Sequence, residues 1–108
     1  MNANERMKNR STTRLVLDPP SFVPPPEMRR DYLELRKAEL ESMFDGAANS
    51  EWKPVNIIAN HVRGTGEMYG FPNIGAAAEN LARAIQNGDA ACMDFLNKYA
   101  TAVNESFV

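Results

Sequence analysis

The only histidine in this chain of 108 residues, His61, stands next to Asn60 and two residues before Arg63. A neutral imidazole keeps a free ring nitrogen that can attack a phosphoryl group, so His61 is a competent nucleophile. Asn60 is not, because the lone pair of its amide nitrogen is delocalised into the carbonyl. If this segment carries chemistry, we expect His61 to be the reacting residue.

Two glycines, Gly64 and Gly66, follow within the same helical pattern. Each costs a helix about 1 kcal/mol relative to alanine, so each implies a reason beyond helix formation. We expect Gly66 to face inward, where close packing of helices leaves no room for a side chain. The spacing of Gly64, Gly66 and Gly70 does not fit a dinucleotide-binding loop, which also needs a preceding strand.

Residues 59–72 read Ala-Asn-His-Val-Arg-Gly-Thr-Gly-Glu-Met-Tyr-Gly-Phe-Pro. The segment resembles the signature helix of histidine-phosphotransfer (HPt) domains, Ala/Gly-His-x-Leu/Met-Lys-Gly-Ser/Thr-Gly/Ala-x-x-Tyr/Phe-Gly-Phe. The positions that match in residue type are Val62, Arg63, Gly64, Thr65, Gly66, Tyr69, Gly70 and Phe71. Asn60 stands where the family has its histidine, and His61 follows one residue later. The resemblance covers roughly residues 27–105, with further support from residues 32–36 and 78–81.

The resemblance implies a phosphocarrier of two-component signalling, which passes phosphoryl groups between aspartates of receiver domains without a cofactor or a metal. It also implies that Arg63 stabilises a phosphoryl group, and that Gly64 leaves space for a receiver domain to approach. Asn60 excludes phosphotransfer through the usual position. We therefore expect an HPt-like protein, degenerate at that position, that docks a response-regulator receiver domain or a hybrid histidine kinase and catalyses nothing itself.

The expected docking surface surrounds His61 on the outer side of the helix. Exposed apolar residues beside a site suggest a binding surface, although cover by the N-terminal segment is a comparable explanation. The residues we assign to this surface are Ile57, Asn60, Gly64, Glu67 and Met68.

Three alternatives remain open from the sequence. In the first, the protein is an active phosphocarrier that uses His61 as a shifted phosphoacceptor. In the second, it is a helical structural or interaction protein with no phosphorelay role. In the third, it is an enzyme in which His61 pairs with Glu67 or Asp94 for acid–base work, but neither carboxylate stands four residues from His61.

The elements that must position these residues are helices. Apolar residues recur at helical spacing in four segments, and no alternating strand pattern is present. The expected helices are 27–44, 49–70, 72–87 and one from about residue 89 onward. Because the links between them are short, we predict an all-α fold, an antiparallel up-down four-helix bundle over residues 26–108.

The orientation of the second helix follows from about 100° of rotation per residue. Its core side then carries Val55, Ile58, Val62, Thr65, Gly66 and Tyr69. Asn60, Gly64 and Glu67 point to solvent, flanked by His61 on one side and Arg63 on the other. Rotating the helix to bring His61 into the family's position would swing Asn60 and Arg63 toward the core, at a cost of several kcal/mol.

Residues 1–25 are predicted to form an extended, proline-rich tail, because five of the seven prolines lie at its end or edge. Its apolar residues could lie as a strap across the helices: Leu15, Val16, Leu17, Phe22 and Val23. The net charge of −2 gives no general attraction to nucleic acid, and no apolar run is long enough to enter a membrane. The single cysteine, Cys92, suits the core, and we expect a cytoplasmic monomer.

Overall fold

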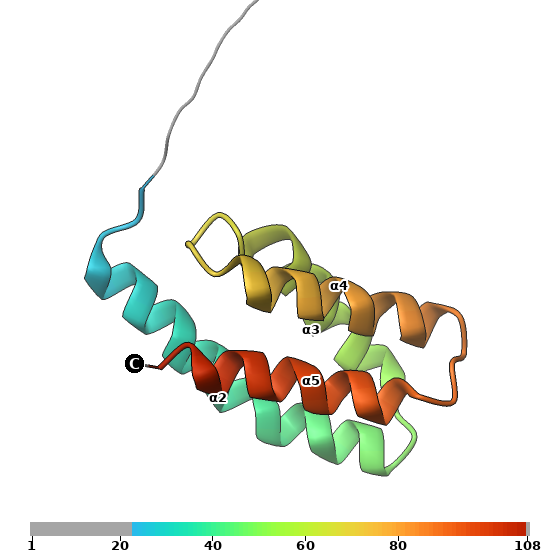
Figure 1. Cartoon of the computed structure of the whole chain (residues 1–108). Coiled ribbons are helices and arrows are strands. Elements are labelled where there is room, and N and C mark those ends of the chain that lie inside the picture. The colour runs from blue at the N-terminus through green and yellow to red at the C-terminus, as the bar shows by residue number, and fades with distance from the viewer. Residues whose placement is uncertain (1–22, 108) are drawn as a thin grey trace, which may run out of the picture.

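The computed structural model describes residues 23–107, and within them every regular element is a helix. In chain order these are α2 (Pro26–Ala48), α3 (Trp52–Thr65), α4 (Pro72–Gln86) and α5 (Cys92–Glu105). Each helix packs against its two neighbours, α2 against α3 and α5, and α4 against α3 and α5 (Figure 1). The predicted four-helix bundle is confirmed. The expected tail and its strap lie almost wholly outside the described residues.

The core fills the space between the four helices. Its largest fully buried side chains come from every helix: Met43, Val55, Val62, Ile74, Leu81, Leu96, Tyr99 and Val103. Cys92 is buried as expected. Within residues 23–107, no helix is long and apolar enough to cross a membrane.

The first helix continues past its predicted end at residue 44 and runs through Gly46 to Ala48. Ala47 and Met43 are buried, so the last turn contributes apolar contact that offsets the helix penalty of a glycine. A Cβ atom on Gly46 would lie 3.0 Å from the carbonyl oxygen of Glu51 and 3.2 Å from Cγ2 of Val55, which explains the small residue. The chain instead reverses at Ser50, whose φ of 59° is positive.

The regular part of α3 begins at Trp52 and ends at Thr65, which is shorter at both ends than predicted. After it, the N–H of Gly70 donates to the carbonyl of Glu67, and that of Phe71 to the carbonyl of Gly66. This pair of hydrogen bonds is the Schellman pattern, and it needs a left-handed residue, which Gly70 provides with φ of +90°. The sequence predicted that the helix ends at Gly70, but the regular helix ends at Thr65 and Gly70 closes the capping turn that follows it.

The last two helices differ from prediction at one boundary. The structure places α4 almost where the sequence predicted it, with Pro72 in its first turn. In contrast, α5 begins at Cys92 and not near residue 89. The carboxylate of Asp89 accepts a hydrogen bond from the N–H of Ala91 at 2.8 Å, so this residue forms a turn before the helix.

Candidate functional site

The outer side of α3 and of the turn after it carries His61 together with two large apolar residues. His61 and Gly64 are exposed, and the exposed fractions of Ile57 and Met68 are 63% and 51%. Their spacing of four, three and four residues places them along one stripe, which we call the outer stripe. The opposite side of the helix is buried, so the predicted orientation of α3 is confirmed.

Asn60 differs from the expectation that it points fully to solvent, because it is only partly exposed. Its amide nitrogen donates to the backbone carbonyl of Asn56 at 3.0 Å and to Oδ1 of Asn56 at 3.1 Å. Both acceptors lie one turn earlier on the same helix. The Asn60 side chain is thus held against its own helix by hydrogen bonds.

The two glycines of the motif have opposite surroundings. A Cβ atom on Gly64 would meet nothing within 4 Å. A Cβ atom on Gly66 would lie 2.7 Å from the backbone nitrogen of Gly75 and 2.8 Å from its Cα. The inward position of Gly66 is as predicted. Its contact with Gly75, at the start of α4, was not predicted from the sequence.

A tyrosine of α2 holds the C-terminal end of α3 from the side. The hydroxyl of Thr65 donates to the carbonyl of His61 at 3.1 Å, so the hydroxyl of Tyr32 is the donor to Thr65 Oγ1 at 2.7 Å. The ring of Tyr32 stacks on Tyr69, with centroids 4.4 Å apart. These contacts fix the backbone at His61 relative to α2, and the sequence did not indicate them.

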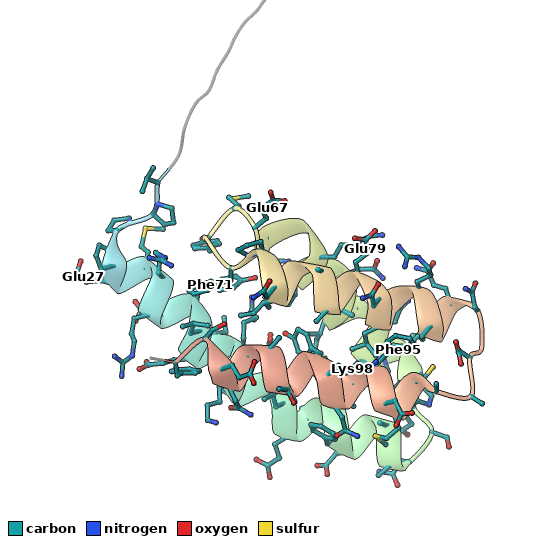
Figure 2. All side chains as sticks on the ribbon, viewed as in Figure 1. Glu27, Glu67, Phe71, Glu79, Phe95 and Lys98 are labelled. Atoms are coloured by element: carbon teal, nitrogen blue, oxygen red, sulfur yellow. The ribbon has the colours of Figure 1, made fainter. Side chains whose placement is uncertain are left out.

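Arg29, on α2, ties that helix to the turn after α3. Its Nε donates to the carbonyl of Tyr69 at 3.2 Å, and its guanidinium lies 5.0 Å from the ring centroid of Phe71. Phe71 is on the inner side of the turn, whereas Glu67 points away from the bundle (Figure 2). The turn that follows the outer stripe is therefore anchored by side chains from a different helix.

Arg36, about two turns further along α2, is buried, with an exposed fraction of 2%. Its Nε and one terminal nitrogen donate to the two carboxylate oxygens of Glu39, at 2.8 and 3.1 Å. The guanidinium also lies 4.6 Å from the ring centroid of Tyr32. A bidentate ion pair of this kind compensates a buried charge. Arg36 thus supports the tyrosine that holds α3, a role that its sequence position did not suggest.

Arg63 and Glu67 are both exposed, and among residues 23–107 neither side chain makes a hydrogen bond or an ion pair. Arg63 is the second residue after His61, so their side chains point about 160° apart around the helix. Arg63 instead lies within about 60° of Asn60, three residues earlier. The guanidinium is therefore placed on the side of Asn60 and away from the imidazole.

The acid–base alternative gains no geometric support. Asp94 lies on α5, which is diagonal to α3 in the bundle and makes no close backbone contact with it. Glu67 lies in the turn beyond the helix that carries His61. Over the described part of the chain, no three His, Cys, Asp or Glu side chains are grouped so that they could hold a metal ion.

Comparisons of the chain with protein-family models, with curated proteins and with solved structures find no match.

Proposed function

We propose that this protein is an HPt-like adaptor of two-component signal transduction, which docks a receiver domain or a hybrid histidine kinase in the cytoplasm. The observation that carries the proposal is the outer stripe. Ile57 and Met68 remain exposed beside His61, and Gly64 leaves the centre of the stripe open. Apolar side chains around an open centre suit a partner helix that packs closely against α3.

The adaptor role is favoured over the carrier role by the placement of the polar groups. Asn60 stands at the family's acceptor position and its amide nitrogen is already hydrogen bonded to Asn56. His61 is about 100° further around the helix, so its imidazole does not stand where the resembled family has its phosphoacceptor. Arg63 is nearer to Asn60 than to His61 in angle, so its charge does not support attack by His61.

The carrier role remains the second candidate, because His61 is exposed and can be reached by a phosphoryl donor. The deciding experiment incubates the protein with a panel of phosphorylated receiver domains and detects acid-labile, base-stable phosphate. We expect binding without phosphate incorporation. Incorporation that His61→Gln abolishes would establish the carrier role instead, since the chain has no other histidine.

Binding itself is tested with a matched pair of substitutions. Met68 and Met93 are both exposed methionines, but Met68 lies at the outer stripe and Met93 lies on α5. Met68→Asp should weaken receiver binding about tenfold, equivalent to about 1.4 kcal/mol, because it replaces an apolar contact of the docking surface with a charge. Met93→Asp should leave the dissociation constant unchanged. If no receiver domain or kinase binds, the chain is a helical interaction protein with another partner.

A further inference from the structure

Most of the exposed apolar residues of the bundle lie on or directly beside two neighbouring helices, α2 and α3. Across residues 23–107, six large apolar side chains are exposed, and Met93 alone lies away from α2 and α3. The other five form what we call the apolar strip: Val23, Met28, Leu35, Ile57 and Met68. The strip includes the two apolar residues of the outer stripe and extends them onto α2.

Two shallow hollows lie between α2 and the turn that follows α3, and Tyr69 lines both of them. One hollow, of about 240 Å³, is lined by Met28, Asp31, Tyr32, Leu35 and Tyr69. The other, of about 320 Å³, is lined by Val23, Pro24, Arg29, Glu67, Met68, Tyr69 and Gly70. Both are at or below the small end of ligand pockets, so they suit single apolar side chains of a polypeptide.

The polypeptide enters the bundle at this strip. Pro24 is buried and lines the second hollow beside Met68, whereas Val23 is 80% exposed. Twenty-two residues precede Val23, and the last eight of them include Leu15, Val16, Leu17 and Phe22. An apolar segment of this chain therefore begins directly beside an uncovered apolar surface.

The segment has sufficient reach. Prolines favour an extended path of about 3.1 Å per residue, so the eight residues from Val23 back to Leu15 span about 25 Å. The strip along α3 from Met68 to Ile57 measures about 16 Å at 1.5 Å per residue. Leu15 can therefore reach the far end of the strip while Val23 stays in place.

The charges of the two parts are complementary. Residues 1–22 hold four basic and two acidic side chains, whereas residues 23–108 hold eight basic and twelve acidic ones. Two of those acidic residues, Asp31 and Glu67, line the two hollows. The basic residues of the N-terminal part all lie in residues 6–14, ahead of the apolar segment, whereas Asp18 lies within it, so the attraction to the acidic bundle comes from the residues that flank the segment.

We propose that residues 15–22 fold back over the apolar strip of the same chain and act as an intramolecular cover. Ile57 and Met68 belong both to the strip and to the proposed docking surface, so a partner must displace the cover to bind. The cover itself does not depend on the identity of that partner. In the free protein the segment covers the apolar strip. Binding of a partner then requires release of the N-terminal segment.

The experiment uses the full chain with Cys92→Ala and Ser11→Cys, a nitroxide spin label on residue 11, and methyl-labelled methionines. The methionines provide the readout: Met28 and Met68 lie in the strip, exposed Met93 lies on α5, and Met43 is buried. We expect the methyl signals of Met28 and Met68 to be broadened by the label while Met93 keeps its intensity. Replacing Leu15, Val16, Leu17 and Phe22 together by Ser should remove the broadening.

Three outcomes would overturn the proposal. Equal broadening at Met93, or none at Met68, would mean that the segment has no preference for the strip. Broadening that survives the fourfold Ser replacement would mean that its apolar residues do not seat it. Broadening that appears only between spin-labelled and isotope-labelled chains in a mixture would identify a second copy as the occupant. Receiver binding is measured separately, so its absence would refute the proposed function and leave the cover standing.

Discussion

Gly64 and Gly66 stand two residues apart and face opposite environments. A side chain at Gly64 would extend into open space, whereas one at Gly66 would meet the backbone of Gly75 within 2.8 Å. The first lies on the outer stripe and the second at the contact between α3 and α4. The same residue type thus keeps a surface open at one position and brings two helices together at the other. Substitutions on the two sides of α3 should therefore affect different properties of the protein.

The largest effect is expected on the open side, for Asn60→His. This change places an imidazole at the family's acceptor position, with Arg63 and the open space at Gly64 nearby. If the proposed function holds, phosphate transfer from a phosphorylated receiver domain should rise from undetectable to measurable. Asn60→Gln is the control, since its amide nitrogen is no nucleophile. A variant that binds the receiver domain and still takes no phosphate would place the defect elsewhere in the site.

The next effect compares Gly66→Ala with Gly64→Ala, measured by denaturant unfolding. The new methyl group at Gly66 meets backbone atoms of Gly75 that cannot move aside, so we expect a loss of about 1–3 kcal/mol in the free energy of unfolding. At Gly64 the methyl group meets nothing, and better helix propensity should add up to about 1 kcal/mol. Similar losses at both positions would contradict the orientation of α3.

The smallest effect is expected in the core, for Tyr99→Phe at neutral pH. The Tyr99 hydroxyl is buried and has no hydrogen-bond partner among the described residues, so its removal should leave stability unchanged or raise it by about 1 kcal/mol. Tyr32→Phe is the matched control. It should cost about 1 kcal/mol because it breaks the hydrogen bond to Thr65.

The same variant has a sharper signature in alkali. Burial raises the pKa of Tyr99 above its ordinary value. The folded protein therefore keeps this proton at a pH where the unfolded chain, with a tyrosine pKa of about 10, has lost it. Stability from this group is complete below about pH 10 and falls as the pH rises further. Tyr99→Phe should flatten that decline, and an unchanged slope in unfolding experiments would count against the burial of Tyr99.

The helix ends show where sequence patterns stop being sufficient. The apolar spacing located all four helices, because a core needs one apolar face on each of them. It ended the first helix too early, since Gly46 looked like a stop signal. The structure keeps Gly46 inside α2, whose last turn buries Ala47, and a Cβ atom at Gly46 would lie 3.0 Å from the carbonyl oxygen of Glu51 and 3.2 Å from Val55. A glycine that makes room for a neighbouring helix and a glycine that ends a helix look the same in one sequence.

The candidate site divides in the same way. The period of the α-helix was enough to predict that His61, Ile57 and Met68 are exposed and that Val62 is buried. These positions follow from the rotation per residue along a single helix. That Asn60 corresponds to the phosphoacceptor position of HPt domains stays a prediction from the sequence. Whether Ile57 and Met68 belong to a docking surface stays a prediction.

Only the tertiary structure decided which residues of the other helices contact α3 and the turn after it. Gly75 of α4 meets Gly66, and Tyr32 of α2, supported by the buried Arg36, meets Thr65. Leu35 and Met28 join Met68 in one apolar strip for the same reason. Such contacts join positions that are far apart in the chain, and they depend on how the helices lie against each other. Periodicity within one segment contains no information about that arrangement, because every rotation of its neighbours is compatible with it.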